Sequence, residues 1–467
     1  MKPWNEIDWK NVRYRIRKLQ KRLALAAQEG DWKKIRNLQN LMYASYDARL
    51  LAVHLVTSRK NRRTPGIDGI FWFTDEERYK AAERINPKTH QFKPFKRIYV
   101  PKDHDRTKLR PLSIPTIEDR AVQALILLAL DPVVETMADP HAYGYRKHRG
   151  PQNAVEDIMT SFGCDAGNIW ILKTDIRECF ENISHEWLLA HPPIKRKILE
   201  RSLKCGYICR GRRYPTGKGL ARGGIISPAL TTFALSGFEP LIKEKYGTHV
   251  RFVRYVDDFL FSADDRTVLE EVKQMLELFL AGRGMTLSEE KTEIRKITEG
   301  VDFIGWNIRR TDRGITAKPS DKFVEELKTR LNAIFVQGTN WSRDRIIRKL
   351  NDEIAGWGLY HAYGITPDTY LELDKLVQNH LWQWAVKRHP KHTWKWIYFH
   401  YWRFRGTSAE RRFSTETQTV RRFADTELRI PAKRDAAINP YLDPGYFRNR
   451  ELRYVKPHNK RQWTRNW

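Results

Sequence analysis

The sequence is poor in cysteine and contains no long apolar run. It has 4 cysteines in 467 residues, too few for a disulfide framework in a chain of this length, which indicates a reducing compartment. No apolar segment approaches the ~20 residues needed to span a bilayer, and the N-terminus lacks the apolar stretch of a signal peptide. These features argue against a membrane protein and against a secreted, disulfide-stabilised domain.

A zinc site has little support in the sequence. Cys205 and Cys209 are close together, but no second pair of Cys or His residues lies near them. Structural zinc sites usually need four such ligands. We therefore interpret both cysteines as ordinary thiols, with zinc binding as the weaker alternative.

Acidic residues are scarce relative to basic ones. The chain has 85 Lys and Arg residues against 56 Asp and Glu, a net charge of +29. Such an excess predicts a polyanionic partner, which is nucleic acid if membranes are excluded. Residues 1–64 carry 16 basic and 5 acidic residues, and residues 377–467 carry 20 and 7. The middle of the chain is therefore close to balanced, as expected if carboxylate chemistry lies between phosphate-binding surfaces.

Tryptophans are interleaved with the basic residues of the C-terminal region, among them Lys387, Arg388, Lys391 and Lys395. Aromatic rings stack on bases while Lys and Arg bind phosphates. The pattern therefore predicts a nucleic-acid-binding surface, although some of these rings must belong to the core. The tryptophans are Trp382, Trp384, Trp394, Trp396 and Trp402.

Apolar spacing predicts an α+β chain with four segments. A basic, helical N-terminal extension covers residues 1–64, an α/β catalytic core 65–310, a helical region 311–400 and a basic tail 401–467. The first helix, at 9–23, is amphipathic, and a nucleic-acid-facing surface explains its basic face with fewer assumptions than a membrane surface. The other expected elements are a helical stretch at 32–56, a hairpin at 92–115, an apolar helix at 117–130, a buried strand at 168–176, a buried helix at 227–238, a second hairpin at 250–262 and only helices after about 318.

The second hairpin carries paired acidic residues in its turn. Asp257 and Asp258 follow Tyr255 and Val256 between apolar runs, and Asp175 ends an apolar strand. Joining nucleotides builds up negative charge around a phosphate, and the common solution is a pair of Mg²⁺ ions about 3.5–4 Å apart. Mg²⁺ prefers carboxylate oxygens and phosphates as ligands. The three aspartates therefore predict a metal-dependent nucleotidyl-transfer site, with a positive group near the paired acids.

An acidic turn is a weak signal by itself, because such residues also occur in ordinary turns. Here further motifs accompany it in a fixed order. Phe180 follows the first aspartate, a glycine-rich loop lies at 219–228, and Lys291 comes after the hairpin. Upstream, Lys102 and Arg110 are spaced to reach triphosphate oxygens. The lysine would contribute a single positive charge, and the arginine two parallel hydrogen bonds. An ordered set of this kind is not expected by chance.

In this order the motifs resemble those of the reverse transcriptases encoded by bacterial and organellar group II introns. The resemblance runs from about residue 5 to about residue 450. It implies a right-hand polymerase, with fingers and a palm built on antiparallel sheet and an all-helical thumb or maturase region. The matching segments are 64–70, 99–102, 110–115, 175–183, 223–228, 254–258, 356–361 and 384–390.

The resemblance also implies roles for individual residues. Asp175, Asp257 and Asp258 would be catalytic, and together with Ile176 they would bind two Mg²⁺ ions, with Mn²⁺ as a substitute. Phe180 would be the steric gate beneath the sugar, which selects dNTPs over rNTPs. The other dNTP-binding residues would be Lys102, Arg110, Arg222 and Lys291. Contacts to nucleic acid would come from Arg13, Arg17, Arg62, Arg63, Gly223, Gly224, Tyr255, Lys387 and Arg388.

The sequence departs from the family pattern in three places. Arg222 stands where the family usually has glutamine before the paired glycines, which adds charge to the nucleotide loop. Val256 replaces the usual alanine before the paired aspartates, so we expect crowding near the primer terminus. The chain also lacks the Cys/His-rich endonuclease segment of many relatives, so we expect no DNA cleavage of its own.

We therefore predict an RNA-directed DNA polymerase, encoded by a group II intron, that acts in splicing and retrohoming. Its partners would be an RNA template such as intron RNA, a DNA primer or target, and dNTPs, with no membrane. The expected location is the bacterial cytoplasm near the nucleoid, or an organelle. Two alternatives stay open: a host-adopted relative in DNA repair, phage defence or CRISPR spacer acquisition, and a non-catalytic RNA-binding splicing factor. The second would show a lost metal ligand, and all three aspartates are present.

Overall fold

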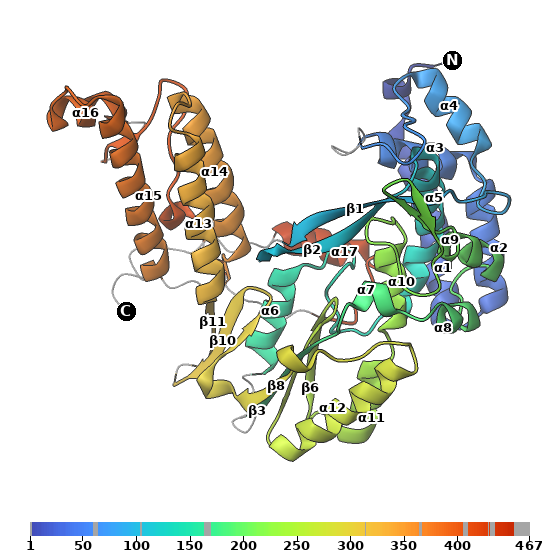
Figure 1. The fold of residues 1–467 in the computed structure, drawn as a ribbon. Helices are drawn as coiled ribbons and strands as arrows, with labels where there is room; N and C mark the ends of the chain where they lie inside the picture. Colours follow the sequence, from blue (N-terminus) through green and yellow to red (C-terminus); the bar gives the residue numbers. More distant parts are fainter. Residues whose placement is uncertain are drawn as a thin grey trace. The chain divides into compact units, whose positions relative to one another are not determined.

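The computed structural model describes residues 2–58, 64–102, 105–162, 170–312, 314–363, 367–404, 410–427, 429 and 435–452. The chain forms two compact units, whose elements are labelled in Figure 1. Unit 1 comprises residues 1–154, 170–294 and 435–452, and unit 2 comprises residues 155–169, 295–434 and 453–467. Each unit has an apolar core of its own.

Helices form the N-terminal part of unit 1. α1 (Trp9–Gln28) confirms the predicted amphipathic helix, with Val12 and Ile16 among its buried residues. The helical stretch predicted at 32–56 is instead two helices, because Ser45 has an extended backbone and caps the second by accepting a hydrogen bond from the amide of Ala48 at 3.3 Å. The apolar helix predicted at 117–130 is confirmed and is longer. The bounds are α2 Trp32–Ala44, α3 Tyr46–Thr57, α4 Asp75–Arg84 and α5 Ile117–Met137.

The first sheet of unit 1 has the strand order β2-β1-β4-β5. β1 and β2 are antiparallel and confirm the hairpin predicted at 92–115, with Val100 opposite Arg110. β4 pairs in parallel with β1, and β5 pairs antiparallel with β4. The bounds are β1 Phe95–Lys102, β2 Asp105–Ile114, β4 Tyr207–Cys209 and β5 Arg212–Tyr214.

The second sheet of unit 1 has the order β6-β7-β3-β8. The strand predicted at 168–176 is β3, and the hairpin predicted at 250–262 is β6 with β7; β7 pairs antiparallel with both β3 and β6. α11 and α12 lie together on one side of this sheet (Figure 1), and α12 turns Leu269, Val272 and Leu276 inward. The bounds are β3 Trp170–Asp175, β6 Arg251–Tyr255, β7 Asp258–Ala263, β8 Glu293–Lys296, α11 Phe238–Tyr246 and α12 Arg266–Ala281.

Short helices connect the two sheets. The single helix predicted at 227–238 is wrong in length, because α10 ends at Ala234 and a new helix begins after Gly237, whose φ is 95°. A positive φ of this kind is readily adopted only by glycine. The bounds are α6 Pro151–Ser161, α7 Cys179–Asn182, α8 His185–Ala190, α9 Arg196–Leu203 and α10 Ser227–Ala234.

The C-terminal segment Asp435–Leu452, which includes α17 (Pro444–Leu452), belongs to unit 1. The guanidinium of Arg149 donates to the carbonyl of Ala436 at 2.9 Å. The hydroxyl of Tyr441 donates to the carboxylate of Asp131 on α5. These contacts attach the segment Asp435–Leu452 to α5 and to the loop that precedes α6.

Unit 2 consists of a three-stranded sheet, order β11-β10-β9, followed by a helical region. Leu331, Leu350 and Leu381, one from each of three helices, are fully buried in its core. The prediction of helices alone after about 318 is wrong in one detail, because β12 and β13 form a small antiparallel pair. The bounds are β9 Val301–Phe303, β10 Trp306–Thr311, β11 Gly314–Pro319, α13 Asp321–Gln337, α14 Arg343–Tyr360, α15 Pro367–Arg388, α16 Trp394–Tyr401, β12 Trp402–Arg403 and β13 Arg412–Phe413.

Across the described residues, no helix has the length and apolarity required to cross a membrane.

Candidate active site

The three aspartates singled out in the sequence meet at one edge of the second sheet. β3 ends at Asp175 and β7 begins at Asp258, and the antiparallel register places these residues directly opposite each other. Opposed residues of this kind have Cβ atoms about 4.5–5.5 Å apart. Asp257 lies in the two-residue turn that joins β6 to β7. Local strand pairing is therefore enough to bring three carboxyl groups together.

Burial and mutual repulsion make the ionised form of these carboxyls costly. Burial, then the charge of Asp175, raises the pKa of Asp257 to about 6. Burial, then the charges of Asp175 and Asp257, raises the pKa of Asp258 to about 7. Adjacent carboxylates raise one another's pKa in this way when no cation neutralises them. The site therefore favours a bound positive charge.

Lys291 supplies one positive charge from within the chain. It ends a short 3-10 helix, η3 (Glu289–Lys291), and its ammonium group contacts the carboxylate of Asp175. Burial on its own lowers the pKa of Lys291, but the contact with Asp175 and the charges of Asp258 and Asp257 outweigh it and raise that pKa. The lysine is thus held at the acidic edge of the sheet, where the sequence led us to expect a positive group.

The donor groups at this edge fit a hard divalent cation. Among the described residues, no group of three or more His, Cys, Asp or Glu side chains is arranged so that it could hold a metal ion as it stands. The three carboxyls nevertheless repel one another and already attract an ammonium group. Carboxylate and backbone carbonyl oxygens are the ligands that Mg²⁺ takes from proteins. Ile176, which directly follows β3, brings a backbone carbonyl to the same edge and bridges Leu287 through its main chain.

The turn that carries Asp257 packs closely against the backbone of Gly144. Val256 has a φ of 59°, which is strained for a β-branched residue. A Cβ on Gly144 would lie 2.3 Å from Cγ2 of Val256 and 2.5 Å from its backbone nitrogen, so only glycine fits there. The amide of Tyr143 donates to the carbonyl of Arg254 at 2.8 Å, which ties the same segment to β6. The valine that replaces the family's alanine therefore packs against Gly144; its predicted effect on the primer stays a prediction.

Arg254 is a functional candidate to which the sequence analysis gave no role. Its side chain is only 2% exposed, and its guanidinium donates to the carbonyl of Val256 at 3.2 Å and pairs with Asp139 at 4.0 Å. Burial is the main influence on the pKa of Arg254 and lowers it. The sequence held one sign of this role: Arg254 is a charged residue in a strand that follows the apolar Phe252 and Val253, both of which are buried. Arg254 therefore contacts the backbone of the turn that carries Asp257.

The glycine-rich loop is joined by its backbone to the element that carries Phe180. Phe180 is buried on α7, and its carbonyl accepts a hydrogen bond from the amide of Leu220 at 2.5 Å. The amide of Gly219 donates to the carbonyl of Ile183 at 2.8 Å. On the other side, a Cβ on Gly223 would lie 2.3 Å from the carbonyl oxygen of Ser113 on β2. The loop is thus fixed between α7 and the first sheet.

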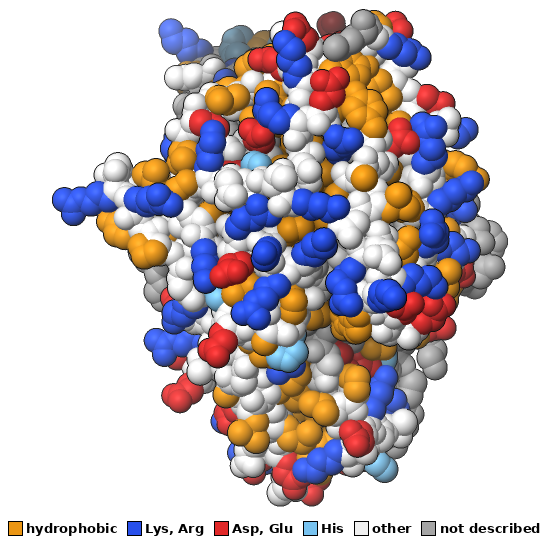
Figure 2. All heavy atoms as spheres, turned by 90° about the vertical axis from the view of Figure 1, so that its right-hand side faces the viewer, with side chains coloured by type: hydrophobic (Ala, Val, Ile, Leu, Met, Phe, Trp, Pro, Cys, Tyr) orange, Lys and Arg blue, Asp and Glu red, His pale blue; other side chains and the backbone are white. Residues whose placement is uncertain are grey.

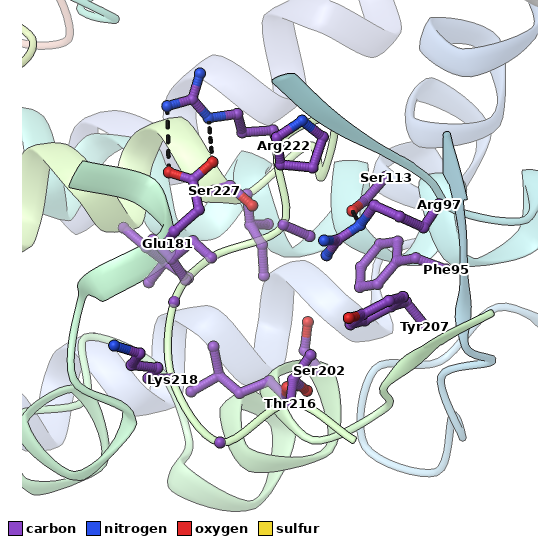
Figure 3. A pocket seen from close by; sticks show the side chains of 18 of the residues that line it. Phe95, Arg97, Ser113, Glu181, Ser202, Tyr207, Thr216, Lys218, Arg222 and Ser227 are labelled. Carbon is purple, nitrogen blue, oxygen red and sulfur yellow. Dashed lines mark hydrogen bonds and ion pairs between the residues drawn. The ribbon is translucent and has the colours of Figure 1, made fainter. Parts of the chain in front are cut away.

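Arg222 in this loop forms an ion pair with the residue after Phe180. Its Nε atom lies 2.8 Å from Oε1 of Glu181, and a terminal nitrogen donates to Oε2 at 3.2 Å, as Figure 3 shows. The same guanidinium lies 5.4 Å from the centroid of the Phe180 ring. The ring of Tyr145 meets Phe180 edge-on at 6.0 Å between centroids. The predicted dNTP-binding residue Arg222 therefore contacts the candidate gate directly.

The remaining predicted site residues are spread over the molecule. Arg110 lies on β2, while the side chain of Lys102 and the residues Arg62 and Arg63 lie outside the described part of the chain. Tyr255 ends β6 next to the acidic turn, and Gly223 and Gly224 belong to the loop. Arg13 and Arg17 on α1 line a separate cavity of about 240 Å³ together with Asp131, Lys147 and Tyr441.

Lys387 and Arg388 end α15 in unit 2. Lys387 is exposed, but Arg388 lies 4.1 Å from the ring centroid of Trp384 and donates to the carbonyl of Trp341 at 2.6 Å. Arg388 thus has a structural role whatever else it contacts. Of the five tryptophans noted in the sequence, Trp384 and Trp402 are core residues, whereas Trp394 is 62% exposed.

Three family models match this chain in order along its length. The N-terminal domain of reverse transcriptase matches residues 4–85, the reverse transcriptase (RNA-dependent DNA polymerase) residues 100–308, and the maturase-specific domain of group II introns residues 324–402. The chain therefore carries reverse transcriptase domains and the maturase-specific domain of group II introns, and the family resemblance noted in the sequence is confirmed. The predicted fold class is confirmed, as is the predicted combination of reverse transcriptase and maturase domains; the two alternative functions are not favoured.

Individual relatives are distant in sequence. Protein YkfC of Escherichia coli strain K12 is 27% identical over 346 residues, which cover 63% of this chain and 88% of that protein. The group II intron-encoded protein LtrA of Lactococcus lactis is 26% identical over 346 residues, covering 59% of this chain and 57% of LtrA. This chain thus spans just over half the length of LtrA. Telomerase from Candida albicans aligns with a TM-score of 0.40 and 14% identity over 67% of this chain and 65% of that chain, a likeness too weak to argue from.

Proposed function

We propose that this group II intron-type protein is an active RNA-directed DNA polymerase that also acts as a maturase on intron RNA. The observation that carries the proposal is the position of Asp175 opposite Asp258, with Asp257 in the adjoining turn. A retired polymerase has no need for three mutually repelling carboxyls, because such a cluster costs stability unless it binds a cation. Retention of all three supports catalysis over a purely structural role.

The three aspartates and the Ile176 carbonyl are the groups that would hold two Mg²⁺ ions, with Mn²⁺ as a substitute. Bound there, the ions would supply the positive charge that activates a 3′-hydroxyl and stabilises the transferred phosphate. Lys291 now neutralises Asp175. Its flexible stem lets the ammonium group move from that carboxylate to a phosphate oxygen of the leaving pyrophosphate. Lys102 and Arg110 of the first hairpin would bind the triphosphate.

Phe180 is the proposed steric gate. It is buried, with the ring of Tyr145 at 6.0 Å and the guanidinium of Arg222 at 5.4 Å from its own ring centroid. A rigid ring excludes a 2′-hydroxyl better than a mobile one, because the added atom cannot push it aside. Selection of dNTPs over rNTPs follows from that rigidity.

Basic and aromatic surfaces support RNA and DNA as the partners. Figure 2 shows Lys and Arg side chains spread over the face that carries the N-terminal helices. In unit 2, the rings of His392, Trp396 and His400 stack with centroids 3.8 and 4.5 Å apart, and Trp394, on the same helix as Trp396 and His400, is exposed. Such surfaces bind phosphates and bases together. We propose intron RNA as the template and a DNA primer or target as the second strand, in a bacterial cell or an organelle.

Primer extension on an RNA template with dNTPs and Mg²⁺ tests this function, with RNA binding measured on the same preparations. The wild type should extend the primer, and Asp257→Ala should bind RNA with unchanged affinity and fail to extend. Tight RNA binding without extension by the wild type would refute the polymerase and favour the non-catalytic splicing factor. Extension by Asp257→Ala would refute the assigned carboxylates.

A further inference from the structure

The side chain of Arg222 points toward Phe180, the proposed steric gate. Figure 3 shows the guanidinium of Arg222 and the carboxylate of Glu181 face to face. Both oxygens of Glu181 are engaged, at 2.8 and 3.2 Å. A glutamine, which the family usually carries here, has no charge to offer a carboxylate. The Arg222–Glu181 pair is therefore a feature of this chain that the family pattern does not predict.

The Arg222–Glu181 pair borders a cavity, while the backbone of Arg222 is held by the amide of Ser113, which donates to the Arg222 carbonyl at 2.6 Å. The stretch 215–222 forms part of the wall of a cavity of about 290 Å³, whose other walls include Phe95 and Tyr207 (Figure 3). Side chains that border a void lose packing contacts on that side. Backbone hydrogen bonds hold this stretch to α7 and its end on one side and to Ser113 on the other. The ion pair adds a side-chain contact between the loop and the residue next to Phe180.

Arg222 also acts on Phe180 itself. Its guanidinium lies within the ~6 Å over which a cation attracts an aromatic face. The pair with Glu181 restrains the guanidinium through one hydrogen bond, at 3.2 Å, and one ion-pair contact, at 2.8 Å. The ring is thus bounded by Arg222 on one side and by the edge of Tyr145 on another.

We propose that Glu181 and Arg222 form a latch that holds the Phe180 ring at a fixed depth and thereby sets how strictly this polymerase selects the sugar. Arg222 is on this account a positioning residue, not a ligand of the triphosphate, and Glu181 is its obligatory partner. The proposal rests on the polymerase function proposed above. It assigns to Glu181, which the motif comparison left without a role, a direct part in specificity.

The test measures single-nucleotide insertion of a dNTP and of the matching rNTP, and compares the two kcat/KM values as a ratio. Arg222→Gln and Glu181→Gln should each lower this dNTP preference roughly tenfold, the combined worth of a partly exposed ion pair and a cation–π contact. The double variant should lose no more than either single variant, because both remove the same interaction. Phe180→Ala removes the ring altogether, so its dNTP-to-rNTP ratio gives the value expected when the gate is lost completely.

Two further variants sharpen the comparison. The charge exchange Glu181→Arg with Arg222→Glu should recover part of the preference, which a triphosphate-binding role for Arg222 cannot explain. Lys218→Gln is the matched control, because Lys218 borders the same cavity and bonds to Asn182 at 3.0 Å without touching the pair. It should leave the ratio unchanged. Equal rises in KM for both nucleotides in Arg222→Gln, with Glu181→Gln unaffected, would overturn the latch.

A double-mutant cycle on thermal unfolding tests the latch without catalysis. Arg222→Gln and Glu181→Gln should shift Tm non-additively, since each leaves the same pair broken. Additive shifts would overturn the pair as a functional unit. Absence of extension by the wild type would instead refute the polymerase function, and with it the selectivity assigned to the latch. Extension by the wild type with unchanged sugar preference in both single variants would refute only the latch.

Discussion

Asp175 and Asp258 face each other across an antiparallel strand pair, and Lys291 reaches the first of them from a separate helix. The antiparallel register of β3 and β7 places the two residues opposite each other. The lysine arrives from the segment that leads into β8. The site therefore combines two opposed carboxyl groups with one ammonium group, an internal cation that a bound metal ion could replace.

The first prediction concerns pH and metal. Asp257 and Asp258 have folded-state pKa values of about 6 and about 7, above the ~3.9 of an unfolded aspartate. The folded protein therefore binds protons more tightly than the unfolded chain, and the contribution of these groups to stability falls as pH rises from about 4 to about 7. Mg²⁺ relieves the repulsion, so its addition should raise Tm more at about pH 8 than at about pH 5.5. An equal rise at both pH values, measured by scanning fluorimetry, would contradict this.

The second prediction concerns the contact behind the acidic turn. Gly144→Ala should lower the free energy of unfolding by about 1–3 kcal/mol and reduce primer extension, because the new methyl group must displace the backbone of Val256. Gly217→Ala is the control, since a Cβ there meets nothing within 4 Å. Urea unfolding measures the loss of stability in both variants, and primer-extension assays measure the loss of activity. Similar behaviour of the two variants would show that the turn tolerates displacement.

The third prediction concerns the C-terminal segment. The hydroxyl of Tyr441 donates to the Asp131 carboxylate, whose pKa burial raises to about 6. Tyr441→Phe should cost about 1–3 kcal/mol of unfolding free energy, because a buried carboxylate loses its donor. The loss should be larger above pH 6, where Asp131 is ionised. Tyr446→Phe, which removes an exposed contact to the amide of Asp435, should change stability little; equal losses would refute the role of Tyr441.

The fourth prediction concerns RNA binding by unit 2. Trp394 is exposed at the start of α16, so Trp394→Ala should weaken RNA binding about tenfold, through lost base stacking, and leave Tm unchanged. Leu359→Ala removes an exposed apolar side chain from α14 in the same unit and should leave RNA affinity as it is. Filter binding with a structured intron RNA measures both. Unchanged affinity in Trp394→Ala would mean that RNA binds elsewhere.

The sequence anticipated the elements whose pattern is local. The apolar runs on either side of Asp257 predicted the hairpin, and the apolar run before Asp175 predicted β3. Pairing of those strands then follows from topology, so the acidic site could be anticipated as well. The break at Ser45 was missed because a single capping residue interrupts an otherwise continuous apolar pattern.

Contacts between distant residues could not be read from the sequence. Arg222 and Glu181 are separated by 41 positions, and Tyr441 and Asp131 by 310. No periodicity links such residues, and basic residues are abundant enough that any one of them could have been the partner. The role of Arg254 was hidden for a different reason, since burial of a charged side chain depends on the fold around it.

The most direct test of the central claim is metal-dependent primer extension by the wild type and by Asp258→Asn, which keeps the shape of the side chain and removes its charge. The account predicts extension by the wild type that is lost on chelation and restored by Mg²⁺, with at least about a thousandfold slower extension by Asp258→Asn. The variant should keep its fold, since it also removes one of the repelling charges. Extension by Asp258→Asn at the wild-type rate would contradict the assignment of this edge of the sheet as the active site.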